Sequence, residues 1–354
     1  MNNITVSIVL PVYNGAPYLS YAIRSILNQT HENFELIILN DGSKDDSENI
    51  IKSFIAKDQR VKYINNDINL GLIATLNKGF DIASGKYIAR MDQDDISSPE
   101  RLSLQIAFLE KLNAPAIVGA NIVIIDKENR VVKVPRQMRT ESSENFWVKF
   151  RKCPIYHPTV MMSREVLTRN GPIYQSKDIH AEDYCAWLRL NKIFPIYNMK
   201  APLLFYRIHG ENYSDTFTSG QISKSLTVLS NSYIEIFSYK ISRSALESLL
   251  FLNTQPASDL RSIFFDILGA GEAFIAIFGH EEFVKKDLAY CIFSIGLKSN
   301  IRTLIFAISF IGRKIGPLAL MNAVMATSNE GLRQVFCKSI YSFKLRSILK
   351  RIVD

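Results

Sequence analysis

The sequence predicts an α/β fold in its first part, a mostly parallel sheet flanked by helices, followed by a helical C-terminal region. Up to about residue 91, short aliphatic runs alternate with segments of helical periodicity. Beyond residue 214 the strand patterns fade and long helical patterns take over. A chain of 354 residues suits two domains, which we expect to comprise residues 1–215 and 216–354.

Aliphatic runs that end in turn residues predict buried strands at residues 6–11, 34–39, 61–65 and 87–91. The segments between them predict helices at residues 18–29, 46–57 and 72–84. Asn14 is expected to be able to cap the first helix, which carries Pro17 in its first turn. This alternation predicts a parallel sheet with helices on both faces.

The pattern after residue 116 is mixed, with strands expected at residues 116–125 and 159–163 and a helix at residues 182–191. The apolar stretch 303–312 is interrupted by Arg313, Lys314 and Pro317, so it falls short of the roughly 20 residues of a spanning helix. The N-terminus lacks the pattern of a signal peptide. Four cysteines without a CxxC pair are expected to be free thiols in a reducing cytoplasm.

The formal net charge of +8 is concentrated near the C-terminus. Residues 288–354 carry ten Lys or Arg against Glu330 and Asp354, and ten minus two equals the whole excess. Apolar residues of the segment 332–343 fall at helical spacing and predict a basic amphipathic helix. No nucleic-acid-binding module accompanies it, so an anionic membrane surface is the expected partner, although packing on the catalytic domain remains an alternative.

Asp92, Asp94 and Asp95 follow the apolar run 85–91 directly. Like charges repel at the end of a buried strand, so a divalent cation is their natural partner. Hard oxygen ligands without a cysteine or histidine cluster favour Mg²⁺ or Mn²⁺ over Zn²⁺. The alternative is an acidic turn that caps the helix beginning near Pro99.

Other polar loops follow the neighbouring strands, at residues 13–15, 40–43 and 66–67. In open α/β sheets, ligands bind at the carboxyl ends of the strands. These loops and the acidic loop 92–95 are therefore expected to form one site.

Five motifs in order resemble family-2 glycosyltransferases of the GT-A fold over roughly residues 4–214. They are residues 6–14, residues 40–43, residues 69–72 with 76–79, the DxD-type residues 92–95, and Glu182 and Asp183 with residues 187–190. The resemblance implies that Pro11, Tyr13 and Asp41 hold a nucleotide base, with Asp41 accepting from a pyrimidine N–H. It implies that Asp92 and Asp94 hold the ribose and a metal-bound diphosphate, and that Asn14 and Asn69 belong to the same donor-binding set.

The resemblance further implies that Asp183 is the general base and that His209 joins Asp94 and Asp92 as a ligand of Mn²⁺ or Mg²⁺. The residues alone leave alternatives open. Asp183 can be a favourable charge at a helix N-terminus, and His209 a surface residue. His157 favours core packing over an acceptor-side role, while Trp187 suits either the core or acceptor stacking.

The implied function is an inverting hexosyltransferase-type enzyme that moves a sugar from a nucleotide-sugar donor, a UDP-sugar, to a glycan or lipid-linked acceptor. This places it in surface polysaccharide synthesis, cytoplasmic and peripheral at the inner face of the cell membrane. A sugar nucleotidylyltransferase would need a glycine-rich basic loop after the first strand, which residues 13–17 do not form. A catalytically silent membrane scaffold would predict a degraded acidic site, whereas Asp41, Asp92, Asp94 and Asp183 are all present.

Overall fold

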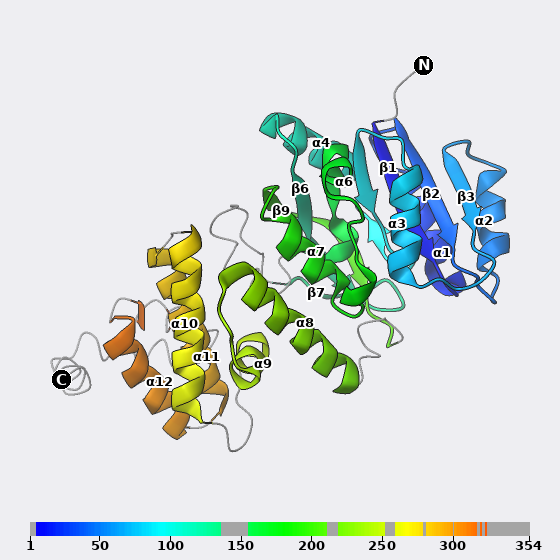
Figure 1. Cartoon of the computed structure of the whole chain (residues 1–354). Helices are drawn as coiled ribbons and strands as arrows, with labels where there is room; N and C mark the ends of the chain where they lie inside the picture. The colour runs from blue at the N-terminus through cyan, green and yellow to red at the C-terminus, as the bar shows by residue number, and fades with distance from the viewer. Residues whose placement is uncertain are drawn as a thin grey trace. The chain divides into compact units, whose positions relative to one another are not determined.

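The computed structural model describes residues 5–135, 155–210, 219–251, 259–278, 281–299, 301–316, 319–320 and 323. These residues form two compact units, the first ending at Ile222 and the second running from Ser223 onward (Figure 1). The predicted boundary near residue 216 lies outside the described residues, so the assignment of separate roles to residues 1–215 and 216–354 stays a prediction.

The first half of the sheet is parallel, as the sequence predicts. Its strands are β1 (Val6–Val12), β2 (Phe34–Asn40), β3 (Val61–Asn65) and β4 (Tyr87–Arg90). The connecting helices are α1 (Ala16–Leu27), α2 (Ser47–Ile55) and α3 (Leu72–Ile82). Since β1 pairs with both β2 and β4 in parallel, the ends of these strands meet at one edge of the sheet.

The second half of the sheet is mixed. It contains β5 (Ile96–Ser97), β6 (Ile117–Ile125), β7 (Val131–Lys133), β8 (Met161–Ser163) and β9 (Ile196–Arg207). The strand order is β3-β2-β1-β4-β8-β6-β9-β5, and β7 pairs with β6. The sequence predictions at residues 116–125 and 159–163 are confirmed as β6 and β8, but β5 and β9 were not predicted.

Helices cover both faces of this sheet, as the sequence predicts. Alternate residues of β1 point to opposite faces, so Ile8 and Leu10 pack against one hydrophobic cluster and Val9 packs against the other. The first cluster takes residues from α1, α2 and α4 (Arg101–Leu112). The second takes residues from α3 and α7 (Glu182–Leu190). The shorter elements are α6 (Arg164–Asn170), η1 (His157–Thr159) and η2 (Ser176–Asp178).

The C-terminal region is helical, as predicted. Its helices are α8 (Ser219–Phe237), α9 (Arg243–Phe251), α10 (Leu260–Phe278), α11 (Glu281–Ser299) and α12 (Ile301–Lys314). Within the described helices we find no stretch whose length and hydropathy would suit a bilayer crossing. The predicted amphipathic helix at residues 332–343 lies outside the described residues.

A buried carboxylate ties β1, β2 and the end of α3 together at the edge of the sheet where these strands begin. Glu35 Oε1 accepts hydrogen bonds from Ser7 Oγ at 2.5 Å and from the Ser84 backbone N–H at 2.8 Å. Glu35 Oε2 pairs with Lys62 Nζ at 2.5 Å. Burial alone would raise the pKa of Glu35, but these contacts outweigh it and lower the pKa to about 2.

We predict that Glu35→Gln lowers the free energy of unfolding by about 1–3 kcal/mol at pH 7, because buried partners lose a charged acceptor. The folded pKa lies below the ordinary value of 4.5, so this stabilisation is present above pH 4.5 and is lost as the pH falls toward about 2. Urea unfolding of both proteins from pH 7 to pH 2 measures it. The exposed Glu110, which pairs with Lys86, provides the matched control Glu110→Gln. If the difference in free energy of unfolding between the wild type and Glu35→Gln stays constant from pH 7 to pH 2, the ionised Glu35 is not the source of this stabilisation.

Candidate functional site

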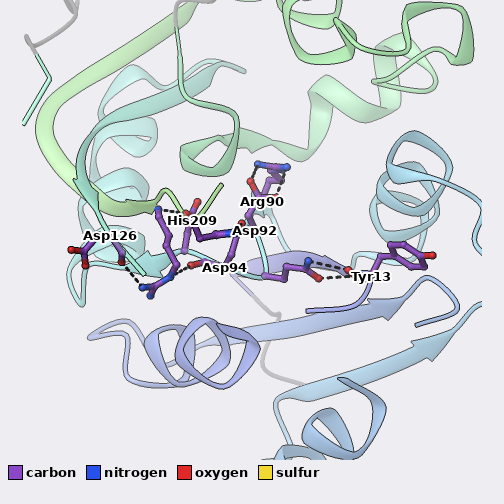
Figure 2. Close-up of polar contacts among 9 residues, drawn as sticks. Tyr13, Arg90, Asp92, Asp94, Asp126 and His209 are labelled. Carbon is purple, nitrogen blue, oxygen red and sulfur yellow. Dashed lines mark hydrogen bonds and ion pairs between the residues drawn. The ribbon is translucent and has the colours of Figure 1, made fainter. Parts of the chain in front are cut away.

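The loop after β1 is joined to the acidic loop 92–95 by the Gln93 side chain. Gln93 Oε1 accepts from the Tyr13 backbone N–H at 2.8 Å, and Gln93 Nε2 donates to the Tyr13 carbonyl at 3.1 Å (Figure 2). A Cβ on Gly15 would lie 2.4 Å from Gln93 Oε1. The absence of a side chain at Gly15 therefore lets the two loops approach this closely.

The prediction that Asn14 caps α1 is wrong. Gly15 is the N-cap residue, and Asn14 has a φ of 49°. Asn14 Oδ1 instead accepts from the Lys44 backbone N–H at 2.8 Å. The first N–H groups of α1 are satisfied by residues at and before the start of α2, because Ser47 Oγ accepts from Gly15 and Asp45 Oδ2 accepts from Ala16, each at 2.9 Å. Asn14 thus joins two loops at the strand ends.

Asp41, at the end of β2, is buried and held by three donors. Its Oδ1 accepts from Asn66 Nδ2 at 2.8 Å and from the Leu70 backbone N–H at 2.9 Å, while Oδ2 accepts from the Gly71 backbone N–H at 2.9 Å. Asn69 also accepts from the Gly71 N–H. These contacts fix the carboxylate and leave acceptor capacity on Oδ2. The Tyr13 ring, at the end of the neighbouring strand β1, is exposed. Pro11, by contrast, is buried inside β1.

The acidic loop brings three carboxylates together at the end of β4. One oxygen from each of Asp92, Asp94 and Asp95 lies within 4.8 Å of the others. Asp94 Oδ2 lies 3.1 Å from His209 Nε2, so the structure places His209 next to the acidic loop. Figure 2 shows His209 beside Asp94, with Asp92 directed toward Arg90.

Asp92 already has a cationic partner. Its two oxygens bind the two terminal nitrogens of Arg90 at 2.5 and 2.6 Å. Arg90 is buried, and its Nε has no hydrogen-bond partner among the described residues. Sequence reasoning placed Arg90 inside a strand and gave it no role. Its role could have been inferred from its place in the sequence, because a charged residue at the end of an apolar strand needs a partner of opposite charge.

The electrostatics of the acidic loop favour an added cation. Burial raises the pKa of Asp92 to about 6, with the charge of Asp94 adding to the effect and Arg90 opposing it. Burial and the charges of Asp94 and Asp92 raise the pKa of Asp95 well above its ordinary value. Asp95 Oδ2 is buried with no hydrogen-bond partner in the described part of the chain. An oxygen-rich set with an unsatisfied carboxylate fits Mg²⁺ or Mn²⁺.

Two further buried arginines hold the backbone of this loop and of the strand that precedes it. Arg101 Nη2 donates to the Arg90 carbonyl at 2.8 Å. Arg207 Nε donates to the Asp94 carbonyl at 2.8 Å, and the Arg207 backbone N–H donates to Asp95 Oδ1 at 2.9 Å. None of these three contacts was predicted, because nothing in the sequence indicates which distant arginine reaches a given loop.

Asp183 lies in the first turn of α7, half-buried, with Oδ1 accepting from the Tyr184 backbone N–H at 2.6 Å. Burial raises the pKa of the adjacent Glu182, and the charge of Asp183 adds to it. Burial also raises the pKa of Tyr174; the charge of Arg90 opposes this, and Asp183, Glu182 and Asp92 reinforce it. Tyr174 therefore lies within electrostatic reach of both the acidic loop and the start of α7.

His157 and Trp187 pack with Tyr174 in the interior. His157 Nε2 lies 2.6 Å from the Tyr174 hydroxyl, and the Trp187 ring meets both in edge-to-face contacts. Burial, followed by the charge of Arg90, lowers the pKa of His157 well below its ordinary value. Trp187 belongs to the core cluster that covers one face of the sheet, which resolves the alternative left open between core and acceptor stacking.

The sequence is similar to that of known glycosyltransferases. A model of glycosyl transferase family 2 matches residues 7–171. An uncharacterized glycosyltransferase of Haemophilus influenzae is 33% identical over 225 residues, which cover 61% of this chain and 69% of that protein. Another, of Rickettsia bellii, is 34% identical over 238 residues, which cover 66% of this chain and 33% of that protein.

The fold is similar to that of S. aureus TarS. The structure of TarS residues 1–349 in complex with UDP-GlcNAc matches with a TM-score of 0.56 and 18% sequence identity, covering 86% of this chain and 89% of that one. At this identity the likeness shows a shared fold, a curled and mostly parallel sheet with flanking helices and a helical C-terminal region.

Proposed function

The chain belongs to glycosyl transferase family 2, and from this we propose that it transfers a sugar from a UDP-sugar to a hydroxyl group of a glycan acceptor, with inversion at the anomeric carbon and with Mn²⁺ or Mg²⁺. One observation carries the proposal: Asp92, Asp94 and Asp95 gather within 4.8 Å of one another at the carboxyl ends of the parallel strands, with His209 at 3.1 Å from Asp94. A diphosphate and its metal ion suit that arrangement.

The donor class rests on the loops beside the acidic site. In the proposal, Tyr13 stacks on the nucleotide base and the fixed carboxylate of Asp41 accepts from its N–H group, which matches the pyrimidine edge of uracil. Pro11, Asn14 and Asn69 shape the same pocket. The complex of TarS with UDP-GlcNAc, a protein of the same fold, supports a UDP-sugar.

Asp183 is the proposed general base. It takes the proton of the acceptor hydroxyl as that oxygen attacks the anomeric carbon, while the bond from this carbon to the diphosphate oxygen breaks and the nucleoside diphosphate leaves. Attack comes from the face opposite the leaving group, so the configuration inverts. In this proposal, the chain's contribution is to hold the carboxylate in position beside the acceptor hydroxyl.

Asp94 and His209 would hold the metal ion, with Asp92 beside them in its pair with Arg90. When bound, the ion offsets the charge that grows on the departing diphosphate. The chain's own contribution is to fix these ligands: Arg207 holds the Asp94 carbonyl and Gln93 joins the acidic loop to the Tyr13 loop.

The proposed acceptor is a lipid-linked glycan of surface polysaccharide synthesis, which places the enzyme in the cytoplasm and peripherally at the inner face of the cell membrane. The excess of basic residues after residue 288 supports this placement. Arg313 and Lys314 at the end of α12 are both exposed.

We predict that manganese-stimulated hydrolysis and binding favour UDP-sugars over dTDP- and GDP-sugars, and that Asp94→Asn abolishes the manganese stimulation while Asp92→Asn weakens it. Removing a hard anionic ligand leaves the diphosphate charge uncompensated. Donor titrations with and without Mn²⁺ measure this, and Asp81→Asn, which alters an exposed carboxylate of α3, is the control. Full manganese-stimulated affinity in Asp94→Asn would remove Asp94 from the metal site.

Asp183→Asn is predicted to keep folding and donor affinity but to lose transfer by roughly a hundredfold, the usual scale for a positioned general base. Single-turnover transfer rates and donor binding are measured on the same preparation. Glu165→Gln removes an exposed carboxylate from the first turn of α6 and is expected to change neither. A loss of less than about tenfold in Asp183→Asn would leave Asp183 as a favourable charge at the helix N-terminus.

The full-length protein is predicted to sediment with anionic vesicles at low salt and to be partly released at high salt, since each basic residue near the surface contributes about 1 kcal/mol. Replacement of Arg333, Lys338 and Lys344 by Gln should weaken this binding. The matched control replaces the exposed Lys52, Lys86 and Lys127 of the first unit by Gln, and this should have little effect on vesicle binding. Equal binding to neutral and anionic vesicles contradicts the electrostatic attachment.

A further inference from the structure

An aromatic ring from α1 packs against the imidazole of His209. The ring centroids of Tyr18 and His209 lie 5.0 Å apart, with 36° between their planes. The guanidinium carbon of Arg207 lies 4.6 Å from the centroid of the same Tyr18 ring. Tyr18 therefore contacts both the residue that holds the acidic loop and the residue that meets Asp94.

His209 lies beyond the sheet that positions its neighbours. Strand β9 ends at Arg207, and the Ile208 backbone N–H still donates to the Ile125 carbonyl at 2.9 Å. Gly210 follows with a φ of 79°, so the chain turns away directly after His209. With the strand ending before it, the imidazole depends on side-chain packing for the orientation of its ring.

The direction of that ring decides whether His209 can serve as a ligand. A histidine binds an ion along the axis of one nitrogen lone pair, so packing that fixes the ring plane also fixes the donor. Nε2 points at Asp94, which leaves the ring face for Tyr18. An aromatic contact of this kind is worth about 0.5–1.5 kcal/mol beyond the area that it buries.

We propose that Tyr18 is a positioning residue that holds the His209 imidazole in its metal-binding orientation. Helix α1 would then help to position the metal site as well as follow the loop proposed to bind the donor. This rests on the proposed function, in which His209 and Asp94 hold the ion. Tyr18 acts through His209 and does not itself contact the ion.

Tyr21 offers a matched control on the same helix. The centroid of its ring lies 5.8 Å from the Arg207 guanidinium carbon, and its side chain is half exposed. The two tyrosines thus share a helix and an arginine neighbour, whereas Tyr18 alone of the pair has a described ring contact with His209. A variant of Tyr21 therefore tests the effect of losing a tyrosine beside Arg207, while a variant of Tyr18 also removes the contact with His209.

The test is direct binding of Mn²⁺ to the full-length protein, followed by the electron paramagnetic resonance signal of free Mn²⁺, with no donor present. Tyr18→Leu is expected to weaken Mn²⁺ affinity by about tenfold, the lower end of the range for residues that orient metal ligands. Tyr18→Phe and Tyr21→Leu are expected to bind as the wild type does. If Tyr18→Leu does not fold, as judged by thermal unfolding, Tyr18→Met replaces it.

A double-mutant cycle with His209→Gln separates this role from general packing. In the His209→Gln protein, Tyr18→Leu is expected to cause no further loss of Mn²⁺ affinity, because its effect passes through the imidazole. An equal loss in both backgrounds, or wild-type affinity in Tyr18→Leu, would overturn the proposal. If the wild type binds no Mn²⁺, the metal part of the proposed function fails and this inference fails with it. If the wild type binds Mn²⁺ and Tyr18→Leu binds it equally well, only this inference is overturned.

Discussion

Neutralisation of the acidic loop by buried arginines is the interaction on which this site depends. Three carboxylates lie within 4.8 Å of one another, and three arginines that are almost wholly buried surround them. Arg90 pairs directly with Asp92, Arg207 binds the carbonyl of Asp94 in the loop, and Arg101 binds the carbonyl of Arg90 at the end of β4. A buried charge without such compensation costs several kcal/mol. The arginines offset part of this charge, and the raised pKa values of Asp92 and Asp95 indicate that a bound cation would offset more of it.

The three arginines come from three different elements of the first unit. Arg90 ends β4, Arg101 begins α4 and Arg207 ends β9, so the loop is held from three separate elements. β5 lies directly after the acidic residues and pairs antiparallel with β9, which brings Arg207 next to Asp95. Arg101 Nη2 donates to the carbonyls of Arg90 and Val160. Burial lowers the pKa of Arg101 to about 9, with the charge of Arg90 adding to the effect.

The sequence predicts those parts of the molecule whose information is local. Strands β1 to β4 are short aliphatic runs between helical segments, and the cluster of aspartates follows one of them directly. Strand β9 is harder to predict, because Pro202 and the exposed Lys200 interrupt it where its pairing with β6 shifts register. β5 has only two residues and exists because β9 pairs with it. Arg207, Gln93 and Tyr18 reach the site through tertiary contacts, which periodicity does not report.

The bond between the Arg207 N–H and Asp95 joins residues 112 positions apart in the chain, and this separation has a consequence for biogenesis. During synthesis the parallel strands β1 to β4 can pair once residue 90 has left the ribosome, since β1 pairs with β2, β2 with β3 and β1 with β4. The acidic residues are made early, but their arginine clamp arrives only with the end of β9. The nascent chain thus carries a nearly complete half-sheet with an open edge at β4 for much of its translation. Such an edge is a place where a partly made protein can pair with a wrong strand, so this span is where a chaperone would be needed most.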